Sequence, residues 1–329
     1  MNVLVTGAAG FIGSHLTERL LARGDRVTGV DNFDPFYSPA EKRQNLATAL
    51  ANDRFRLIEA DLCCGKETLA GVLKHDPPET IVHLAAKTGV RASMRDPAGY
   101  AGANVTGTLT VLDLARQLGT KRVVVASSSS VYGRRAGGPF GEDDGVEPVS
   151  PYAATKRAAE LLSRAHQERH GGSLLCLRFF TVYGPRQRPD MAIRKFTALM
   201  VQGRPVPMYG DGGTARDYTW IEDLLGGAVA AVDRGAVEPE EFQIINLGGN
   251  GTTELHRLIG LLGAALGVEP VVEHLPPQPG DVARTWADIG KARRLLGYRP
   301  TTSIEEGIPR FVDWFLNQPA LRAPQFAVQ

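Results

Sequence analysis

The sequence predicts an α/β protein in which a doubly wound parallel sheet is joined to a smaller, interleaved α/β lobe. Short apolar runs rich in β-branched residues alternate with segments whose apolar residues recur at helical spacing, as is typical of sheets covered on both faces. Strands are expected at residues 2–5, 26–30, 55–59, 80–83, 122–126, 174–180 and 243–246. Helices are expected from 11 towards 24, from about 40, and at 97–118, 152–169, 221–233, 289–296 and 304–315.

The domain boundary is expected near residue 180, where the composition shifts towards proline, glycine and arginine. Residues 1–180 are expected to form the sheet domain. Residues 221–247 predict a further helix and strand that return to it, so residues 181–329 are mainly, but not wholly, a second lobe that binds substrate.

The first turn is rich in glycine and opens directly into a helix. Gly7, Gly10 and Gly13 lie three residues apart, and Phe11 and Ile12 begin the helical pattern. The first amides of a helix lack internal partners and lie at the positive end of its dipole, so they can hold a pyrophosphate. Glycines let the backbone approach that ligand closely. The turn therefore predicts a dinucleotide site in a sheet of the Rossmann type.

An acidic residue, Asp31, ends the second strand. Its carboxylate could accept hydrogen bonds from both hydroxyls of an adenosine ribose and would repel a 2′-phosphate, which favours NAD over NADP. Asn32 follows it and begins an aromatic loop, residues 32–39, most of which we expect at the surface.

Two further strand ends predict contacts to the dinucleotide. Asp61 and Leu62 follow the third strand, where the carboxylate could meet the adenine amino group or be satisfied within its own loop. The fourth strand is followed by Leu84, Ala85, Ala86 and Lys87, where a dinucleotide should cross the sheet. His83, at the end of that strand, is expected to pack in the core.

Hydroxyl, phenol and ammonium groups follow the fifth strand. Four serines, Ser127–Ser130, stand at its carboxyl end, where ligands bind in α/β sheets; a serine-rich turn is the alternative. Tyr152 and Lys156 lie four apart in the next helix, so their side chains share a face. A tyrosine with a pKa of about 10 is a poor base at neutral pH, and a nearby ammonium would lower that pKa. Together these groups predict proton transfer beside a nicotinamide.

Composition excludes several other classes of protein. The chain has 329 residues and a formal net charge of +1 without a long basic run, so neither a nucleic-acid nor an anionic-membrane surface is expected. The three cysteines, Cys63, Cys64 and Cys176, lack the spacing of metal ligands, and we expect reduced thiols and no metal. With neither a signal-peptide pattern nor a membrane-spanning apolar run, the expected location is cytoplasmic.

These motifs, in this order, resemble one family over nearly the whole chain. The residues that carry the resemblance are Gly7-x-x-Gly10-x-x-Gly13, Asp31, Ser128 and Tyr152-x-x-x-Lys156. They are similar to the extended short-chain dehydrogenase/reductase family of NAD-dependent sugar-nucleotide epimerases and dehydratases. The resemblance implies that Tyr152 is the active-site base and acid, and that Lys156 binds the nicotinamide ribose and tunes Tyr152. It also implies that Ser128, or its neighbour Ser129, hydrogen-bonds the reacting hydroxyl.

The same resemblance implies a UDP-sugar substrate and a homodimer. Arg216 lies in a stretch similar to the one that carries a nucleotide-phosphate arginine in the family, and Asp281 stands where an Asp can meet the nucleotide ribose. The dimer would form through the helices at 97–118 and 152–169.

Two local features indicate the reaction. Family dehydratases carry an Asp-Glu pair after the active-site Thr and the decarboxylases a Glu, whereas this chain has Ser129 and Ser130. Without an acid to assist elimination, the expected cycle is oxidation at C4, rotation of the ketone and return of hydride to its opposite face. Residues 178–192 also resemble UDP-glucuronate 4-epimerases, with Thr181 where glucose epimerases usually have Asn, although Gln187 replaces the usual glycine before Arg188.

We therefore expect interconversion of UDP-glucuronate and UDP-galacturonate, with a clamp for the C6 carboxylate. Its expected members are Ser129, Ser130, Thr181 and Arg188, because hydroxyls and a guanidinium suit a carboxylate that a neutral hexose lacks. Two alternatives remain at this point. One is a UDP-glucose/UDP-galactose 4-epimerase or another hexose epimerase, and the other is a non-catalytic NAD-binding regulator on the same fold.

Overall fold

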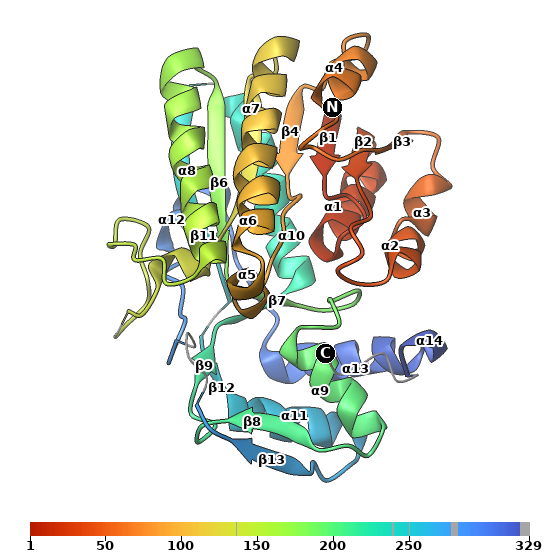
Figure 1. Ribbon diagram of the computed structural model, residues 1–329, viewed down its shortest axis with the longest axis vertical. Coiled ribbons are helices and arrows are strands. Elements are labelled where there is room, and N and C mark those ends of the chain that lie inside the picture. The colour runs from red at the N-terminus through yellow and green to blue at the C-terminus, as the bar shows by residue number, and fades with distance from the viewer. Residues whose placement is uncertain (136, 239, 250, 278–281, 323–329) are drawn as a thin grey trace.

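The chain folds into a large lobe and a smaller lobe joined by several crossings of the backbone (Figure 1). The computed structural model describes residues 1–135, 137–238, 240–249, 251–277 and 282–322. Within these residues, no helix has both the length and the apolar character that crossing a membrane requires.

The large lobe is built on a seven-stranded parallel sheet within the described residues. Its strands are β1 (Asn2–Thr6), β2 (Arg26–Asp31), β3 (Phe55–Glu59), β4 (Thr80–His83), β5 (Arg122–Ser128), β6 (Ser173–Phe179) and β11 (Glu241–Leu247). Their order is β11-β6-β5-β4-β1-β2-β3, so the direction of winding reverses between β1 and β4. Ligands of open α/β sheets bind at such a reversal, at the carboxyl ends of the strands.

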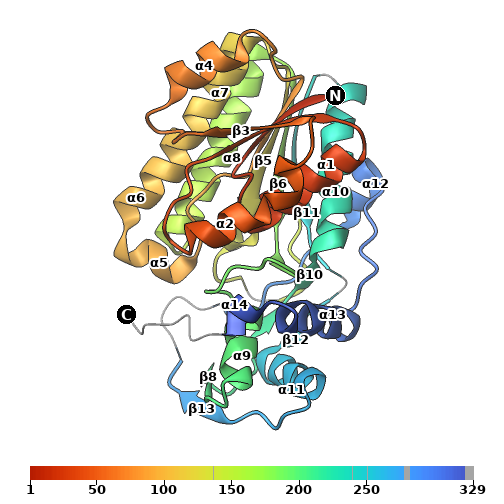
Figure 2. The same cartoon turned by 90° about the vertical axis from the view of Figure 1, so that its right-hand side faces the viewer.

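Helices cover both faces of this sheet (Figure 2). They are α1 (Phe11–Ala22), α2 (Pro39–Asn45), α3 (Ala47–Leu50), α4 (Lys66–Leu73), α5 (Val90–Arg95), α6 (Pro97–Ala101), α7 (Gly107–Leu118), α8 (Pro151–His170), α10 (Ile221–Val237) and α12 (Gly290–Leu296), with a π-helical turn η1 (Gly102–Thr106) and a 3₁₀ turn η2 (Ser129–Tyr132). Helices α4, α7 and α8 lie on one face, and α1, α10 and α12 lie on the other. The doubly wound parallel sheet predicted from the sequence is confirmed.

The small lobe consists of short strands and helices from the second half of the chain. They are β7 (Thr181–Tyr183), α9 (Ala192–Val201), β8 (Val206–Tyr209), β9 (Ala215–Arg216), β10 (Tyr218–Trp220), β12 (Thr253–Glu254), α11 (Leu255–Leu266), β13 (Val272–Leu275), α13 (Ile304–Leu316) and α14 (Pro319–Arg322). The chain leaves the sheet after β6 and returns to it with α10 and β11. It returns again with α12, which packs against both α10 and β11.

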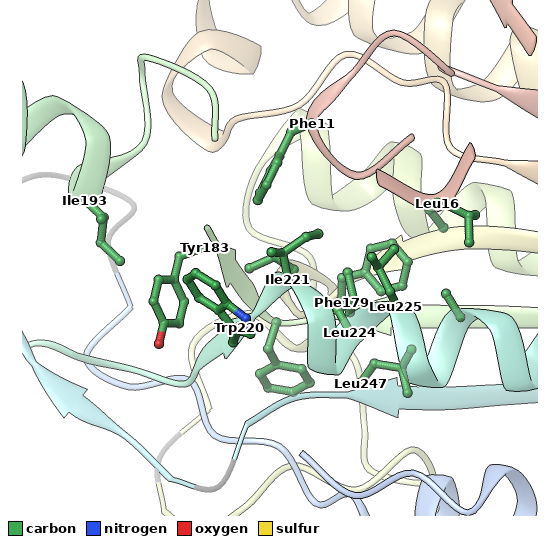
Figure 3. Packing of buried hydrophobic residues seen from close by; sticks show 14 of the residues in the cluster. Phe11, Leu16, Phe179, Tyr183, Ile193, Trp220, Ile221, Leu224, Leu225 and Leu247 are labelled. Carbon is green, nitrogen blue, oxygen red and sulfur yellow. The ribbon is translucent and has the colours of Figure 1, made fainter. Parts of the chain in front are cut away.

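An aromatic and aliphatic cluster joins the lobes (Figure 3). The rings of Tyr183 and Trp220 meet edge to face, with centroids 5.3 Å apart, on the paired strands β7 and β10. Ile193 of α9 lies on the small-lobe side, and Ile221 continues the cluster into α10. All four residues are buried, so the hydrophobic effect holds the lobes together at this joint.

The helix expected at 97–118 is interrupted, which changes the residues that it buries. The π turn η1 separates α6 from α7 and inserts Asn104 and Thr108 into the interior. Regular helical spacing over 97–118 predicts Leu109 on or near the buried side, but Leu109 is 46% exposed. A π turn winds the backbone by one extra residue, so it rotates everything after it relative to a regular helical spacing. Sequence periodicity alone could not place that rotation.

His83 is a fully enclosed neutral histidine, as expected. Thr108 Oγ1 donates to the carbonyl of Asn104, so it accepts the proton on His83 Nε2 across 3.2 Å. His83 Nδ1 then accepts from the hydroxyl of Thr6 at 2.8 Å. Burial, with a smaller effect of the Lys156 charge, lowers the pKa of His83 from 6.5 to about 3. No group in this network accepts the second proton of a charged imidazole without breaking a hydrogen bond.

We predict that His83 makes the protein sensitive to acid. At pH 5 the unfolded chain binds a proton at this histidine and the folded chain does not, so stability is complete above pH 6.5 and falls towards pH 3 by about 1.4 kcal/mol per pH unit. The difference in unfolding free energy between wild type and His83→Gln, measured by urea denaturation, should therefore shrink as pH falls. The exposed His75→Gln should show a constant difference, and a constant difference for both would contradict the assignment.

A buried ion pair ties α8 to the sheet beneath the cavity. Arg178 of β6 binds both carboxylate oxygens of Glu160 at 2.7 and 2.9 Å, and both side chains are only 1% exposed. The Ser127 hydroxyl donates to the same carboxylate at 2.6 Å. Burial would raise the pKa of Glu160, but the hydrogen bonds from Arg178 hold it below its usual value. The carboxylate is thus ionised and shared among three elements, β5, β6 and α8.

We predict that breaking this pair by removing one partner is strongly destabilising. Glu160→Gln leaves the buried guanidinium of Arg178 without its counter-charge, which should lower the free energy of unfolding by about 3–5 kcal/mol. Glu168→Gln removes an exposed pair with Arg164 on the same helix and should cost less than about 1 kcal/mol. Chemical denaturation of both variants tests the contrast, and equal losses would show that the buried position carries no special weight.

Candidate active site

A cavity of about 1080 Å³ opens at the carboxyl ends of the strands, at the reversal between β1 and β4. Residues of both lobes line it. Every residue that the sequence predicted to contact the dinucleotide lies on its wall, and so do the predicted catalytic residues and the four members of the expected carboxylate clamp. Of the predicted site residues, Arg216 does not line this cavity, and Asp281 lies outside the described residues.

The glycine turn forms one wall of the cavity. Gly7 has a φ of +72°, and a Cβ on it would lie 2.7 Å from the backbone nitrogen of Ala85. A Cβ on Gly13 would lie 2.0 Å from the carbonyl oxygen of Gly7. Gly10 caps α1 without a side-chain hydrogen bond. The turn is therefore tight enough to bring the N-terminus of α1 to the cavity, and this cradle fits a pyrophosphate.

Asp31 lines the cavity at the end of β2, as the sequence predicts for a ribose-binding carboxylate. The backbone nitrogens of Ala9 and Phe33 donate to its two carboxylate oxygens at 3.0 and 2.8 Å. Burial raises its pKa, and the two backbone hydrogen bonds oppose that shift. Asn32 Nδ2 donates to Asp61 at 2.8 Å, so Asp61 both lines the cavity and is satisfied by its neighbours.

The loop after β4 is fixed by Asn104, a residue that sequence reasoning missed. Its side chain accepts from the backbone nitrogen of Lys87 at 2.8 Å and donates to the Lys87 carbonyl at 2.9 Å. It also donates to Thr155 of α8 at 2.9 Å. Asn104 thus joins the loop after β4, which lines the cavity, to the helix that carries Tyr152. The π turn that turns it inward left no signal in the hydrophobic pattern.

Ser128, Tyr152 and Lys156 line one part of the cavity. Ser150 caps α8 by accepting from the backbone nitrogen of Ala153 at 3.1 Å, which fixes the first turn that presents Tyr152. Lys156 Nζ donates to the carbonyl of Ala126 at 2.8 Å, and burial lowers its pKa to about 8.

The electrostatics around Tyr152 differ from our expectation. Burial raises its pKa, and the groups that oppose this are a hydrogen bond with Ser128 and the positive charge of Arg188. We expected Lys156 to lower it, but the Lys156 ammonium is hydrogen-bonded to the end of β5 instead. The cation that acts on Tyr152 in this structure therefore comes from the segment between β7 and α9.

Arg188 lies on the cavity wall with its guanidinium bonded to Asp190 through Nε and Nη2, at 3.0 and 2.9 Å. Gln187, which replaces the usual glycine, is 1% exposed. Its amide donates to the carbonyl of Val182 at 3.1 Å and accepts from the backbone nitrogen of Arg194 at 3.2 Å. The buried side chain of Gln187 thus fixes the backbone before Arg188 through two hydrogen bonds. With glutamine at this position, Arg188 still lines the cavity.

The remaining expected clamp residues have hydroxyls at the same cavity. Ser130 donates its backbone N–H to Ser128 Oγ at 3.2 Å. The hydroxyl of Ser128 in turn donates to the hydroxyl of Ser130 at 3.2 Å. Ser129 and Thr181 are half-buried on the wall. The hydroxyls of the expected clamp therefore line the same cavity as the guanidinium of Arg188.

Arg216 belongs to a different part of the small lobe. It lies on β9, opposite Thr253 of β12, and its Nη1 donates to the carbonyl of Ala215 at 2.9 Å. Arg216 therefore does not line the cavity that holds Tyr152, and its contact with a nucleotide phosphate stays a prediction.

Most residues of the aromatic loop after β2 are exposed, as expected, and Phe36 is one of them. Phe33 and Tyr37 are instead buried, with only 5% and 8% of their surface exposed. The Arg43 guanidinium lies 4.1 Å from the centroid of the Phe33 ring, and the Lys42 ammonium lies 4.7 Å from that of Tyr37. The charged helix α2 therefore covers these rings, and Tyr37 lines the cavity.

Comparison with known proteins identifies the family. The profile of the GDP-mannose 4,6 dehydratase family matches residues 4–311. A UDP-glucuronate 4-epimerase of Thermodesulfobacterium geofontis is 40% identical over 313 residues, covering 94% of this chain and 95% of its own length. A probable UDP-glucuronate 4-epimerase of Rhizobium meliloti is 37% identical, covering 96% and 97%.

Solved structures with the same architecture include enzymes of two reactions. A UDP-glucuronic acid 4-epimerase of Bacillus cereus, in complex with UDP-glucuronic acid and NAD, has a TM-score of 0.88 and 36% identity, covering 95% of this chain and 98% of its own. A dTDP-glucose 4,6-dehydratase of Streptomyces venezuelae has a TM-score of 0.91 and 33% identity, covering 99% and 100%. Backbone similarity therefore does not separate the reactions, although it agrees with the motifs. This chain belongs to the extended short-chain dehydrogenase/reductase family of nucleotide-sugar epimerases and dehydratases.

Proposed function

We propose that the chain is an NAD-dependent nucleotide-sugar 4-epimerase that interconverts UDP-glucuronate and UDP-galacturonate through a 4-keto intermediate. The observation that carries this proposal is that Arg188 and Thr181 line the same cavity as Tyr152. A guanidinium and a hydroxyl in this cavity suit a sugar with a carboxylate, and a neutral hexose does not require them. The relatives named above as UDP-glucuronate 4-epimerases support the same substrate.

The cavity has the residues that such a cofactor needs. The cradle at Gly7 and Gly13 would hold the pyrophosphate, Asp31 the adenosine ribose and Lys156 the nicotinamide ribose. When bound, NAD supplies the acceptor and donor of the hydride at C4. Because the same hydride returns to the sugar, the cycle consumes no external oxidant or reductant.

The protein's own groups move the proton and hold the sugar. Tyr152 would take the proton of the C4 hydroxyl as C4 is oxidised and give it back after the ring has turned. Ser128, which lines the cavity with Tyr152, would hydrogen-bond the same sugar oxygen. The positive charge of Arg188 stabilises the phenolate form that this step needs, and thereby opposes the effect of burial.

The carboxylate clamp has a second task. Oxidation at C4 of a uronate makes a β-keto acid, which can lose carbon dioxide. Ser129, Ser130, Thr181 and Arg188 would hold the carboxylate away from the geometry in which its C–C bond aligns with the ketone. None of the residues at positions 129 and 130 is an acid, so the elimination expected of the dehydratases lacks its catalyst.

We also propose a cytoplasmic homodimer. Helices α7 and α8 pack side by side on one face of the sheet and expose the large apolar residues Leu109 and Leu161 by 46% and 52%. Apolar side chains on neighbouring helices favour an interface with a second copy. The free thiols of Cys63, Cys64 and Cys176 suit a reducing compartment.

The proposed reaction is tested by product analysis. Purified protein incubated with UDP-glucuronate should invert C4 of the sugar, as observed by NMR, and should leave UDP-glucose unchanged. Tyr152→Phe should slow this turnover by about 100- to 10,000-fold while still binding UDP-glucuronate, because it removes only the proton-transfer group. Inversion of UDP-glucose alone would favour a hexose epimerase, a pentose product would indicate decarboxylation, and turnover unaffected by Tyr152→Phe would refute the mechanism.

The clamp is tested at Arg188. Arg188→Ala should raise the KM for UDP-glucuronate by about 10- to 100-fold, because it removes a charge-assisted hydrogen bond to the carboxylate. Initial rates measured over a range of substrate concentrations give this value, and NMR of the product should show an increased pentose fraction. Arg204→Ala, an exposed arginine on the small lobe, is the matched control and should leave both unchanged. An unaltered KM in Arg188→Ala would show that the carboxylate is held elsewhere.

A further inference from the structure

The hydroxyl of Tyr37 is buried at the cavity without a hydrogen-bond partner among the described residues. The residue is 8% exposed, and burial raises the pKa of its phenol, so the group is protonated at neutral pH. Buried hydroxyls in folded proteins nearly always have a partner. Because the Tyr37 side chain lines the cavity, a bound molecule can supply the missing partner.

Local interactions fix the ring in this position. The Lys42 ammonium lies 4.7 Å from the ring centroid and donates to the carbonyl of Asp34 at 2.7 Å. Ser38, next to Tyr37, caps α2 by accepting from the backbone nitrogen of Glu41 at 3.4 Å. Tyr37 therefore reaches the cavity from a segment whose backbone and side chain are both held.

One buried guanidinium fixes Tyr37 relative to the clamp. Arg194 of α9 is 1% exposed and binds both carboxylate oxygens of Glu41, four residues after Tyr37. The same guanidinium donates to the carbonyl of Gln187 at 2.7 Å, directly before Arg188. The segments that carry Tyr37 and Arg188 are thus both bound to the guanidinium of Arg194. The positive charge of Arg188 also acts to lower the pKa of Tyr37, against the larger effect of burial.

We propose that Tyr37 is a substrate-binding residue whose hydroxyl donates a hydrogen bond to the sugar carboxylate beside Arg188. This inference rests on the proposed function, because it requires a uronate in the cavity. A carboxylate has two oxygens that each accept more than one hydrogen bond, so a guanidinium and a neutral phenol can hold it together. Tyr37 would then join Ser129 and Ser130 as a clamp residue of the large lobe, while Arg188 comes from the segment between β7 and α9.

The test separates the sugar from the nucleotide. Tyr37→Phe keeps the ring and removes the hydroxyl, so the KM for UDP-glucuronate should rise about tenfold to a hundredfold. The inhibition constant of UDP, which has no carboxylate, should stay within about twofold of wild type. Tyr209→Phe is the matched control, because Tyr209 lies outside the cavity with its ring under Arg91, and it should change neither value.

A double-mutant cycle tests whether Tyr37 and Arg188 share one group. If both hold the same carboxylate, Tyr37→Phe combined with Arg188→Lys should raise KM by less than the product of the single effects. An unchanged KM in Tyr37→Phe, or an equal rise in the inhibition constant of UDP, would overturn this inference while wild-type turnover leaves the proposed function standing. Failure of the wild type to invert UDP-glucuronate would refute both.

Discussion

The buried pair of Glu160 and Arg178 is the constraint on which the large lobe's catalytic residues depend. It joins α8 to β6, and through Ser127 it also reaches the end of β5. Those elements carry Tyr152, Lys156 and Ser128, so their relative positions follow from one shared carboxylate. Replacing such a pair with apolar residues would maintain packing, but removing one partner strands a charge. The buried ion pair of Glu160 and Arg178 therefore fixes the relative positions of the catalytic residues more than it adds to the free energy of unfolding.

A second buried guanidinium, that of Arg194, fixes the relative positions of segments from the two lobes. Arg194 binds Glu41 of α2 and Gln187, which follows β7 in the chain, so the aromatic loop of the large lobe and the segment of Arg188 share one anchor. The apolar cluster at Tyr183 and Trp220 holds the lobes together by the hydrophobic effect, which has no preferred direction. The hydrogen bonds of Arg194 are directional, because its guanidinium donates within a fixed plane.

Sequence patterns predicted the parts of this structure that depend on local chemistry. The glycine turn, Asp31 and the spacing of Tyr152 and Lys156 each act through neighbours in the chain, and the cavity contains them all. The residues that were missed act over long separations. Asn104 turns inward only because a π turn rotates its helix, and Tyr37 is buried only because α2 covers it. The helix from about residue 40 was expected, but the sequence did not show that its Lys42 and Arg43 would pack over the rings of the loop.

Substrate choice in this fold must lie in a few side chains. A dehydratase shares the backbone at a TM-score of 0.91, so sheet order and lobe arrangement are compatible with elimination as well as inversion. What differs is which groups surround C4 and C6. Here Ser129 and Ser130 leave elimination without an acid, while Arg188 adds a cation that acts on Tyr152. In the proposed reaction, Arg188 would therefore distinguish a uronate from a neutral hexose, because only the uronate offers its guanidinium a carboxylate.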